Sequence, residues 1–219
     1  MNRTNTNAVV GGALVALGAL ALLQNFGLLG ALAGLLWAAM GTAGGLAFLG
    51  VYLRRPDAWW AAIPGAGLLG LAAVTAIGTL MPWAAGGWLG GLFLGSIGLG
   101  FCLVYAGRHE HWWAVIPAGV MLTLAAVAGL SDVLSGDTVG AVFFLGLALT
   151  FGALSRLPGQ EERLRWALIP AGVMLTMSLV VLLATSHLVS WIVPAALILG
   201  GLAILYRNGL FFRREGSER

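Results

Sequence analysis

The chain has 219 residues, of which 60% are hydrophobic and only 9% are charged. A soluble domain carries roughly 25% charged residues, so a soluble fold of this length would leave much of its apolar surface uncovered. The net charge of +3 does not indicate a nucleic-acid-binding protein, because the arginines lie between long apolar runs.

Five long intervals contain no Asp, Glu, Lys or Arg, and they hold the candidate membrane spans. A spanning helix needs about 20 mostly apolar residues, and lipid offers no partner to an open backbone N–H or C=O group. The intervals therefore predict eight transmembrane helices. The expected spans are 8–25, 28–53, 58–81, 86–106, 112–131, 138–156, 164–185 and 188–207. We expect the first fifty residues to form spans one and two and not a cleaved signal peptide.

One line of sequence recurs at a constant spacing. WAAIPGAGLLG begins at Trp60, WAVIPAGVMLT at Trp113 and WALIPAGVMLT at Trp166, each 53 residues after the one before. A fixed period of this length is typical of a repeat architecture. We predict an all-α membrane protein of four tandem helical hairpins. The expected units are 7–56, 57–109, 110–162 and 163–212, and 208–219 is a basic tail.

The distribution of arginine predicts the orientation in the membrane. All eleven arginines lie at Arg3, after the second, fourth and sixth spans, or in the tail, whereas the other turns carry only Asp132 and Asp137. Basic residues are enriched in cytoplasmic loops. We therefore expect a multi-pass protein of the bacterial inner (plasma) membrane, with both termini in the cytoplasm.

Aromatic residues mark the cytoplasmic ends of the predicted spans. Indole and phenol rings favour the boundary between lipid and water. We predict that the membrane-interface anchors are Trp59, Trp60, Trp112, Trp113, Trp166, Tyr52, Tyr105 and Tyr206. Pro64, Pro117 and Pro170 each follow a tryptophan by four residues, in the first helical turn, where a missing N–H costs little. The alternative is a proline hinge, which requires each helix to begin well before the tryptophan.

Small and hydroxyl residues provide the other features of the spans. Many of the 34 glycines are four residues apart, a spacing that favours close helix packing in lipid. The interiors of the spans contain no Asp, Glu, His, Lys or Arg, which weakens the case for an ion-coupled carrier. Thr123 and Thr176 occupy equivalent positions in the repeat and are the candidate cavity-lining residues.

The sequence provides little material for catalysis or cofactor binding. His109 and His111 flank a glutamate in a linker, but a metal site needs about four ligands, so we expect no metal. Nucleophile-elbow, P-loop, dinucleotide-binding and zinc-protease motifs do not occur in the sequence. We predict a protein that is not an enzyme, has no catalytic residues and carries no cofactor.

The first unit, GGALVALGALALLQNFGLL followed by LLWAAMGTAGGLAFLGVYLRR, resembles the bacterial transmembrane hairpins of LiaI/LiaF-type proteins. The polar turn at Gln24 and Asn25 and the basic close at Arg54 and Arg55 match the outline of that family. The resemblance covers about fifty residues and implies envelope-stress sensing or association with membrane partners. Later units replace the Asn turn, and no functional residue is carried over.

Three functions are open from the sequence. We expect a scaffold, an accessory subunit or an envelope-stress partner, whose contacts are the lipid bilayer and another membrane protein or a second copy of the chain. One alternative is a channel or carrier for a neutral or lipid-like solute. The other is a pigment- or quinone-binding subunit of an electron-transfer complex. Nucleic acid is not an expected partner.

Overall fold

The computed structural model describes residues 3–26, 30–55, 57–158, 163–185, 194 and 197–205. Over these residues the chain forms helices joined by short turns, so the prediction of an all-α protein is confirmed for this part of the sequence. The elements are α1 (Arg3–Asn25), α2 (Ala31–Arg54), η1 (Trp59–Ala61), α3 (Ala62–Leu80), η2 (Pro82–Ala84), α4 (Gly87–Gly107), η3 (Trp112–Ala114), α5 (Val115–Leu130), α6 (Gly136–Leu154), η4 (Arg165–Ala167) and α7 (Leu168–Thr185). Residues 197–205 are also helical.

Six of the described helices are long and apolar enough to cross a membrane. They are Ala31–Arg54, Trp59–Leu80, Gly87–Gly107, Trp112–Leu130, Gly136–Leu154 and Arg165–Ala184, and they correspond to predicted spans two to seven. The predicted first span falls within α1, whose apolar part is the shorter stretch Leu14–Leu23. The predicted eighth span is described only at 194 and 197–205, and the tail 208–219 lies outside the described residues. The full count of eight spans therefore stays a prediction.

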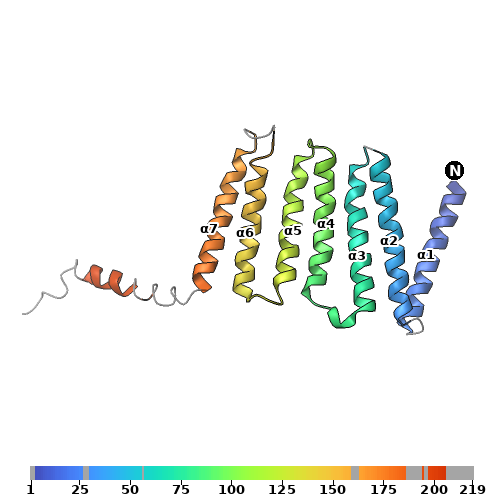
Figure 1. Ribbon diagram of the computed structural model, residues 1–219, viewed down its shortest axis with the longest axis horizontal. Helices are drawn as coiled ribbons and strands as arrows, with labels where there is room; N and C mark the ends of the chain where they lie inside the picture. Colours follow the sequence, from blue (N-terminus) through green and yellow to red (C-terminus); the bar gives the residue numbers. More distant parts are fainter. Residues whose placement is uncertain are drawn as a thin grey trace, which may run out of the picture.

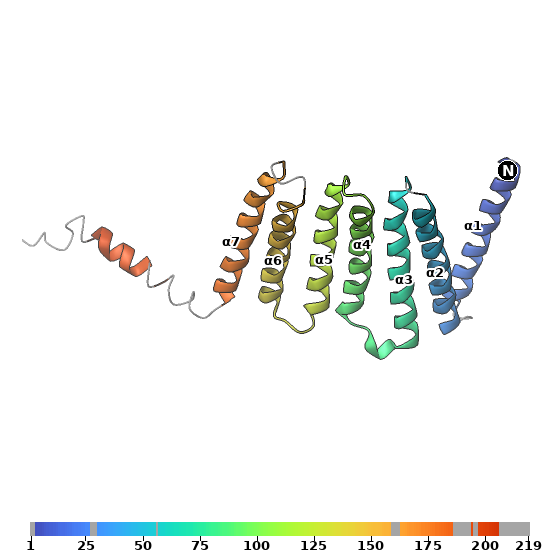
Figure 2. The ribbon, with the colours of Figure 1, turned by 45° about the horizontal axis from the view of Figure 1, so that its top comes forward.

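The helices stand in a row in chain order, and α2 to α7 pack mainly on the helices before and after them (Figure 1). Consecutive helices run antiparallel. The linkers after α2, α4 and α6 lie at one end of the helices, and the turns after α1, α3 and α5 lie at the opposite end of the helices (Figure 2). We call these the linker end and the turn end. Asp132 and Asp137 belong to the turn end.

Glycines allow neighbouring helix backbones to approach closely. An ideal Cβ at Gly91 of α4 would lie 2.6 Å from the Ala125 carbonyl oxygen of α5. One at Gly45 of α2 would lie 2.9 Å from the Gly65 carbonyl oxygen of α3. Such approaches stabilise helix pairs in lipid through backbone contact. The most extensive helix pairings are α2 with α3, α4 with α5 and α6 with α7, and the members of each pair are joined by a linker. The predicted hairpins instead group helices that are joined by a turn, and this grouping stays a prediction.

A short 3₁₀ turn precedes α3, α5 and α7, and each repeat proline lies just after it. Pro64, Pro117 and Pro170 are the third residues of these three α-helices. In this first turn the N–H groups have few intrahelical partners, so a residue without an N–H is tolerated. The tryptophans before them lie in the 3₁₀ turns η1, η3 and η4, which places the aromatic rings at the linker end.

We expect Pro117→Ala to change the free energy of unfolding by about 1 kcal/mol or less, because alanine accepts the same first-turn conformation and proline there mainly restricts the unfolded chain. The check is the midpoint of thermal unfolding of the purified protein in detergent. A large drop in the yield of folded protein would show that the proline acts as a hinge on which the packing depends.

At the turn end, a side chain from one turn caps a helix that begins in another. The Gly87 N–H, at the start of α4, donates a hydrogen bond to Asp132 Oδ2 at 2.7 Å. Asp132 follows α5, so this contact ties the end of α5 to the beginning of α4. A carboxylate is favoured at this position because the helix N-terminus carries a partial positive charge and unpaired N–H groups.

We predict that Asp132→Ala destabilises the protein by about 1 kcal/mol, the usual effect of losing a helix N-terminal cap. Asp132→Asn is the matched variant: it keeps an oxygen acceptor and should retain most of the stability. Thermal unfolding of both variants tests the assignment. Equal losses for Ala and Asn would indicate that the charge of Asp132, and not its hydrogen bond, stabilises this turn.

Candidate functional site

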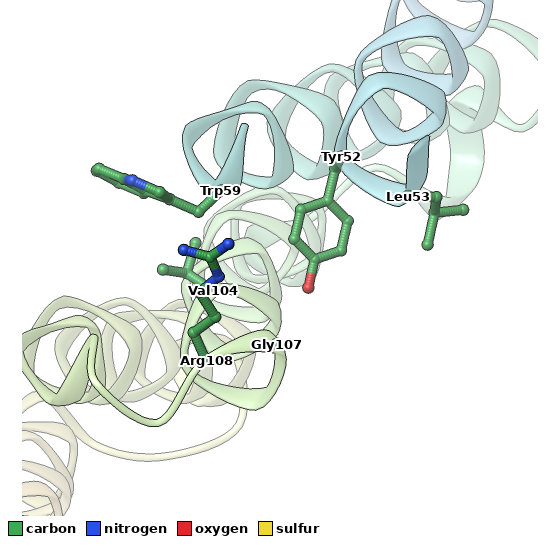
Figure 3. A pocket seen from close by; sticks show the side chains of 6 residues that line it. All are labelled: Tyr52, Leu53, Trp59, Val104, Gly107 and Arg108. Atoms are coloured by element: carbon green, nitrogen blue, oxygen red, sulfur yellow. The ribbon is translucent and has the colours of Figure 1, made fainter. Parts of the chain in front are cut away.

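A small cavity lies at the linker end, where α2, η1 and α4 meet. Its volume is about 230 Å³, and its lining residues are Tyr52, Leu53, Trp59, Val104, Gly107 and Arg108 (Figure 3). Beneath it lies a fully buried cluster of Ala62, Val104 and Ala114, on which Tyr52 and Trp59 pack. The small alanine side chains let three helices converge, and the larger aromatic rings cover the junction.

Tyr52 connects two helices that are not neighbours in the row. Its hydroxyl donates a hydrogen bond to the Leu103 carbonyl oxygen of α4 at 2.8 Å. An ideal Cβ at Gly107 would lie 2.6 Å from the Tyr52 hydroxyl oxygen, so a glycine is needed for the ring to reach this position. Tyr52 thus holds the end of α2 against α4, past the start of α3.

The charged groups of the site form an exposed ion pair. Arg108 Nη2 lies 3.0 Å from Asp57 Oδ1, and the two side chains are 41% and 95% exposed. A pair with this exposure contributes about 0–1 kcal/mol. It joins the linker after α2 to the end of α4, in parallel with the Tyr52 hydrogen bond.

Aromatic rings from two linkers pack beside the cavity. Trp59 lies 5.1 Å from His111 and 5.4 Å from Trp113, measured between ring centroids. His111 Nδ1 is buried and has no hydrogen-bond partner among the described residues. His109 instead packs on Tyr105 at 5.0 Å. The two histidines therefore have different neighbours, and within the described ranges no three His, Cys, Asp or Glu side chains gather as metal ligands.

The remaining predicted interface residues that the structure describes also lie at the linker end. Trp60 and Trp166 are 50% and 47% exposed, and they contact Phe48 and Phe151 edge to face. Trp112 packs against the buried pair Leu154 and Leu164, and Arg163 lies 5.9 Å above its ring. Tyr206 lies outside the described residues. This arrangement suits rings that are partly in an apolar layer and partly at its edge.

The two candidate cavity-lining threonines have different environments. Thr123 is 6% exposed and lies against Gly146 of α6. Thr176 is exposed on α7, and its hydroxyl donates to the Gly172 carbonyl oxygen of its own helix at 2.9 Å. Neither lines the cavity in Figure 3, and the structure does not bring the two together.

Threonine and glycine form a reciprocal contact between α5 and α6. Thr123 of α5 lies against Gly146 of α6, and Thr150 of α6 lies against Gly119 of α5. Sequence reasoning missed this pairing, although Gly-x-x-x-Thr occurs at 119–123, 146–150 and 172–176 and could have indicated it. Spacing of four residues places both members on one face of each helix, so each threonine fills the space that the opposite glycine leaves.

The described residues form an all-helical protein with six helices suited to crossing a membrane. A small site lined by aromatic and basic side chains lies at its linker end. Comparison with protein-family models, with curated proteins and with solved structures found no match to this chain.

Proposed function

We propose that the chain is a non-catalytic multi-pass protein of the bacterial inner membrane that works by association, as a scaffold, an accessory subunit or an envelope-stress partner. The observation that supports this most strongly is the single row of helices. Helices in a row present side chains on two broad faces, and large apolar residues such as Leu99 and Leu149 are 58% and 65% exposed there. Such faces fit lipid and other transmembrane helices.

The hydroxyl groups of the helices support the same proposal. Thr42, Thr75, Thr79, Thr150 and Thr176 each donate to a carbonyl oxygen four residues earlier in the same helix. Ser178 is buried and donates to the Ala141 carbonyl oxygen of α6 at 2.9 Å. These bonds commit the hydroxyls to helix structure and packing, whereas a polar path for a solute needs hydroxyls that face it.

A photocrosslinking experiment in native membranes tests the association. A photoreactive amino acid replaces Leu99 or Leu149 on the exposed faces, and Leu154, which is 0% exposed, serves as the buried control. We expect one exposed position to form an adduct of defined mass with a membrane protein and the buried control to form none. Adducts with lipid alone at every exposed position would contradict the proposal.

Purification from native membranes tests the alternatives at the same time. We expect a colourless protein that retains one partner in stoichiometric amount. Visible absorbance bands would favour a pigment- or quinone-binding subunit. Solute flux through vesicles that contain only this protein would favour a channel or carrier.

The proposed orientation places both termini and the linker end in the cytoplasm, because the linker arginines lie at that end. We expect a reporter fused after Arg219 to show cytoplasmic activity, and one inserted in the turn between α5 and α6 to show periplasmic activity. A periplasmic signal from the C-terminal fusion would overturn the topology without affecting the packing of the row.

A further inference from the structure

One face of α7 is apolar and uncovered. It comprises Ile169, Gly172, Val173, Thr176 and Val180, which recur at helical spacing on one side, and we call it the α7 stripe. Ile169, Val173 and Val180 are 73%, 53% and 52% exposed. An ideal Cβ at Gly172 would meet nothing within 4 Å, and the Thr176 hydroxyl bonds only within its own helix.

The same five residue types form a covered face on α5. Counting back 53 positions from the α7 stripe reaches Ile116, Gly119, Val120, Thr123 and Val127. On α5 none of these five is exposed, because α6 lies across them. Ile116 packs on the cluster that contains Leu154 of α6, and Gly119 and Thr123 meet Thr150 and Gly146. The α7 stripe therefore repeats a surface that elsewhere in this chain receives the next helix.

The chain itself contains a segment that matches this surface. Residues 197–205 are helical and apolar, and Leu197, Leu199 and Ile204 are 72%, 67% and 62% exposed. Ideal Cβ atoms at Gly200 and Gly201 would meet nothing within 4 Å. We infer that helix 197–205 docks antiparallel on the α7 stripe, with Thr176 against the Gly200–Gly201 pair.

The register of the docked helix against α7 is inferred from two residue contacts between packed helices earlier in the chain. Thr123 meets Gly146, 23 positions further along, and Gly70, which lies 53 positions before Thr123, meets Ser96, 26 positions further along. The same separations counted from Thr176 reach residues 199–202, a window that includes both glycines. Glycine at the contact point lets the threonine and the opposite backbone approach closely, as at Gly146.

Length and connection favour this segment over a second copy of the chain. Only residues 186–196 separate α7 from the helix at 197–205, so the segment is held at high effective concentration beside the α7 stripe. Short connections make consecutive helices antiparallel neighbours. The docked helix would cover the exposed face of the last well-packed helix of the row.

Disulfide trapping tests the docking in native membranes. Cys102 is the single cysteine, so Cys102→Ala gives a background without thiols. In it, Thr176→Cys with Gly200→Cys is the test pair. Gly90→Cys with Ala128→Cys is the positive control, because an ideal Cβ at Gly90 lies 3.9 Å from the Ala128 Cβ, within the range of a disulfide. Ser178→Cys with Gly200→Cys is the negative control, because Ser178 lies on the other side of α7 from Thr176, buried against α6, where its hydroxyl donates to the Ala141 carbonyl oxygen. A disulfide forms only when the two Cβ atoms come within about 4.5 Å.

We expect mild oxidation to remove both reactive thiols from the test pair and from the positive control, with each protein remaining a monomer. The negative control should keep its thiols. If the test pair fails to accumulate, Gly172→Cys with Ile204→Cys probes the same register, because in an antiparallel pair a step of four residues back on α7 matches a step of four residues forward on the docked helix. Persistent free thiols in the test pair, while the positive control closes, would overturn the inference. Dimers formed by Thr176→Cys alone would overturn it in favour of a second copy on the α7 stripe.

Discussion

Gly91→Ala is expected to lower the free energy of unfolding by about 2–3 kcal/mol, the upper part of the range for overpacking. The new methyl group would lie 2.6 Å from the Ala125 carbonyl oxygen and 3.2 Å from the Gly129 backbone nitrogen. Both atoms belong to the backbone of α5, so relief requires the two helices to separate and lose contacts along their length. The measurement is thermal unfolding in detergent, followed by helix content.

Gly90→Ala is the matched control for this prediction. Residue 90 is the next position in the same helix, and an ideal Cβ there would lie 3.9 Å from the Ala128 Cβ, an ordinary contact. Both substitutions gain the same helix propensity, up to about 1 kcal/mol, so the difference between them isolates the clash. Equal stability of the two variants would mean that α4 and α5 do not approach as closely as the structure shows.

Leu154→Ala is expected to destabilise the protein by about 2–4 kcal/mol, because it leaves a cavity in a closed cluster. Leu154 at the end of α6 is 0% exposed, and it packs with Leu164 and Ala167 on the two sides of the linker to α7. Trp112 of η3 and Ile116 of α5 also pack on this cluster. The cavity would therefore weaken the junction of α5, α6 and α7 at the linker end.

Leu149→Ala is the control, since Leu149 lies in the same helix and is 65% exposed. It loses the same atoms without opening a cavity, and we expect a change within about 0.5 kcal/mol. Unfolding midpoints of both variants in the same detergent provide the comparison. A loss at Leu149 as large as that at Leu154 would show that Leu149 is covered in the folded protein, by a partner or a second copy.

The positions of the helices along the chain were predictable, but the way they pack was not. Charge-free intervals gave six spans whose observed ends lie within about three residues of the expected ones, because bilayer thickness controls the length of an apolar run. Apolar helices in lipid carry side chains of similar hydropathy on every face. Hydropathy therefore does not indicate which face of a helix meets its neighbour, and spacing of small residues is the better guide.

The linker-end site was also predictable only in part. The interface tryptophans were placed from their positions at the ends of spans. The hydrogen bond from Tyr52 to Leu103 and the ion pair of Asp57 with Arg108 were not predicted, since they join residues about fifty positions apart and depend on how two linkers fold over α3. Thr123 was predicted as a candidate cavity-lining residue, and its contact with Gly146 of α6 was not predicted.

The row arrangement determines how the fold would come apart. Because α3 to α6 each have a neighbour on both sides, whereas a terminal helix has only one, the outermost helices should fray first and the middle of the array should hold longest, as in other nearest-neighbour repeats. The Tyr52 hydrogen bond is an exception to this nearest-neighbour packing, because it connects α2 with α4, two helices that are separated by α3 in the row. At the turn end, the Asp132 hydrogen bond to Gly87 joins the neighbouring helices α4 and α5. We therefore expect α2, α3 and α4 to stay together at the linker end when the outer helices open.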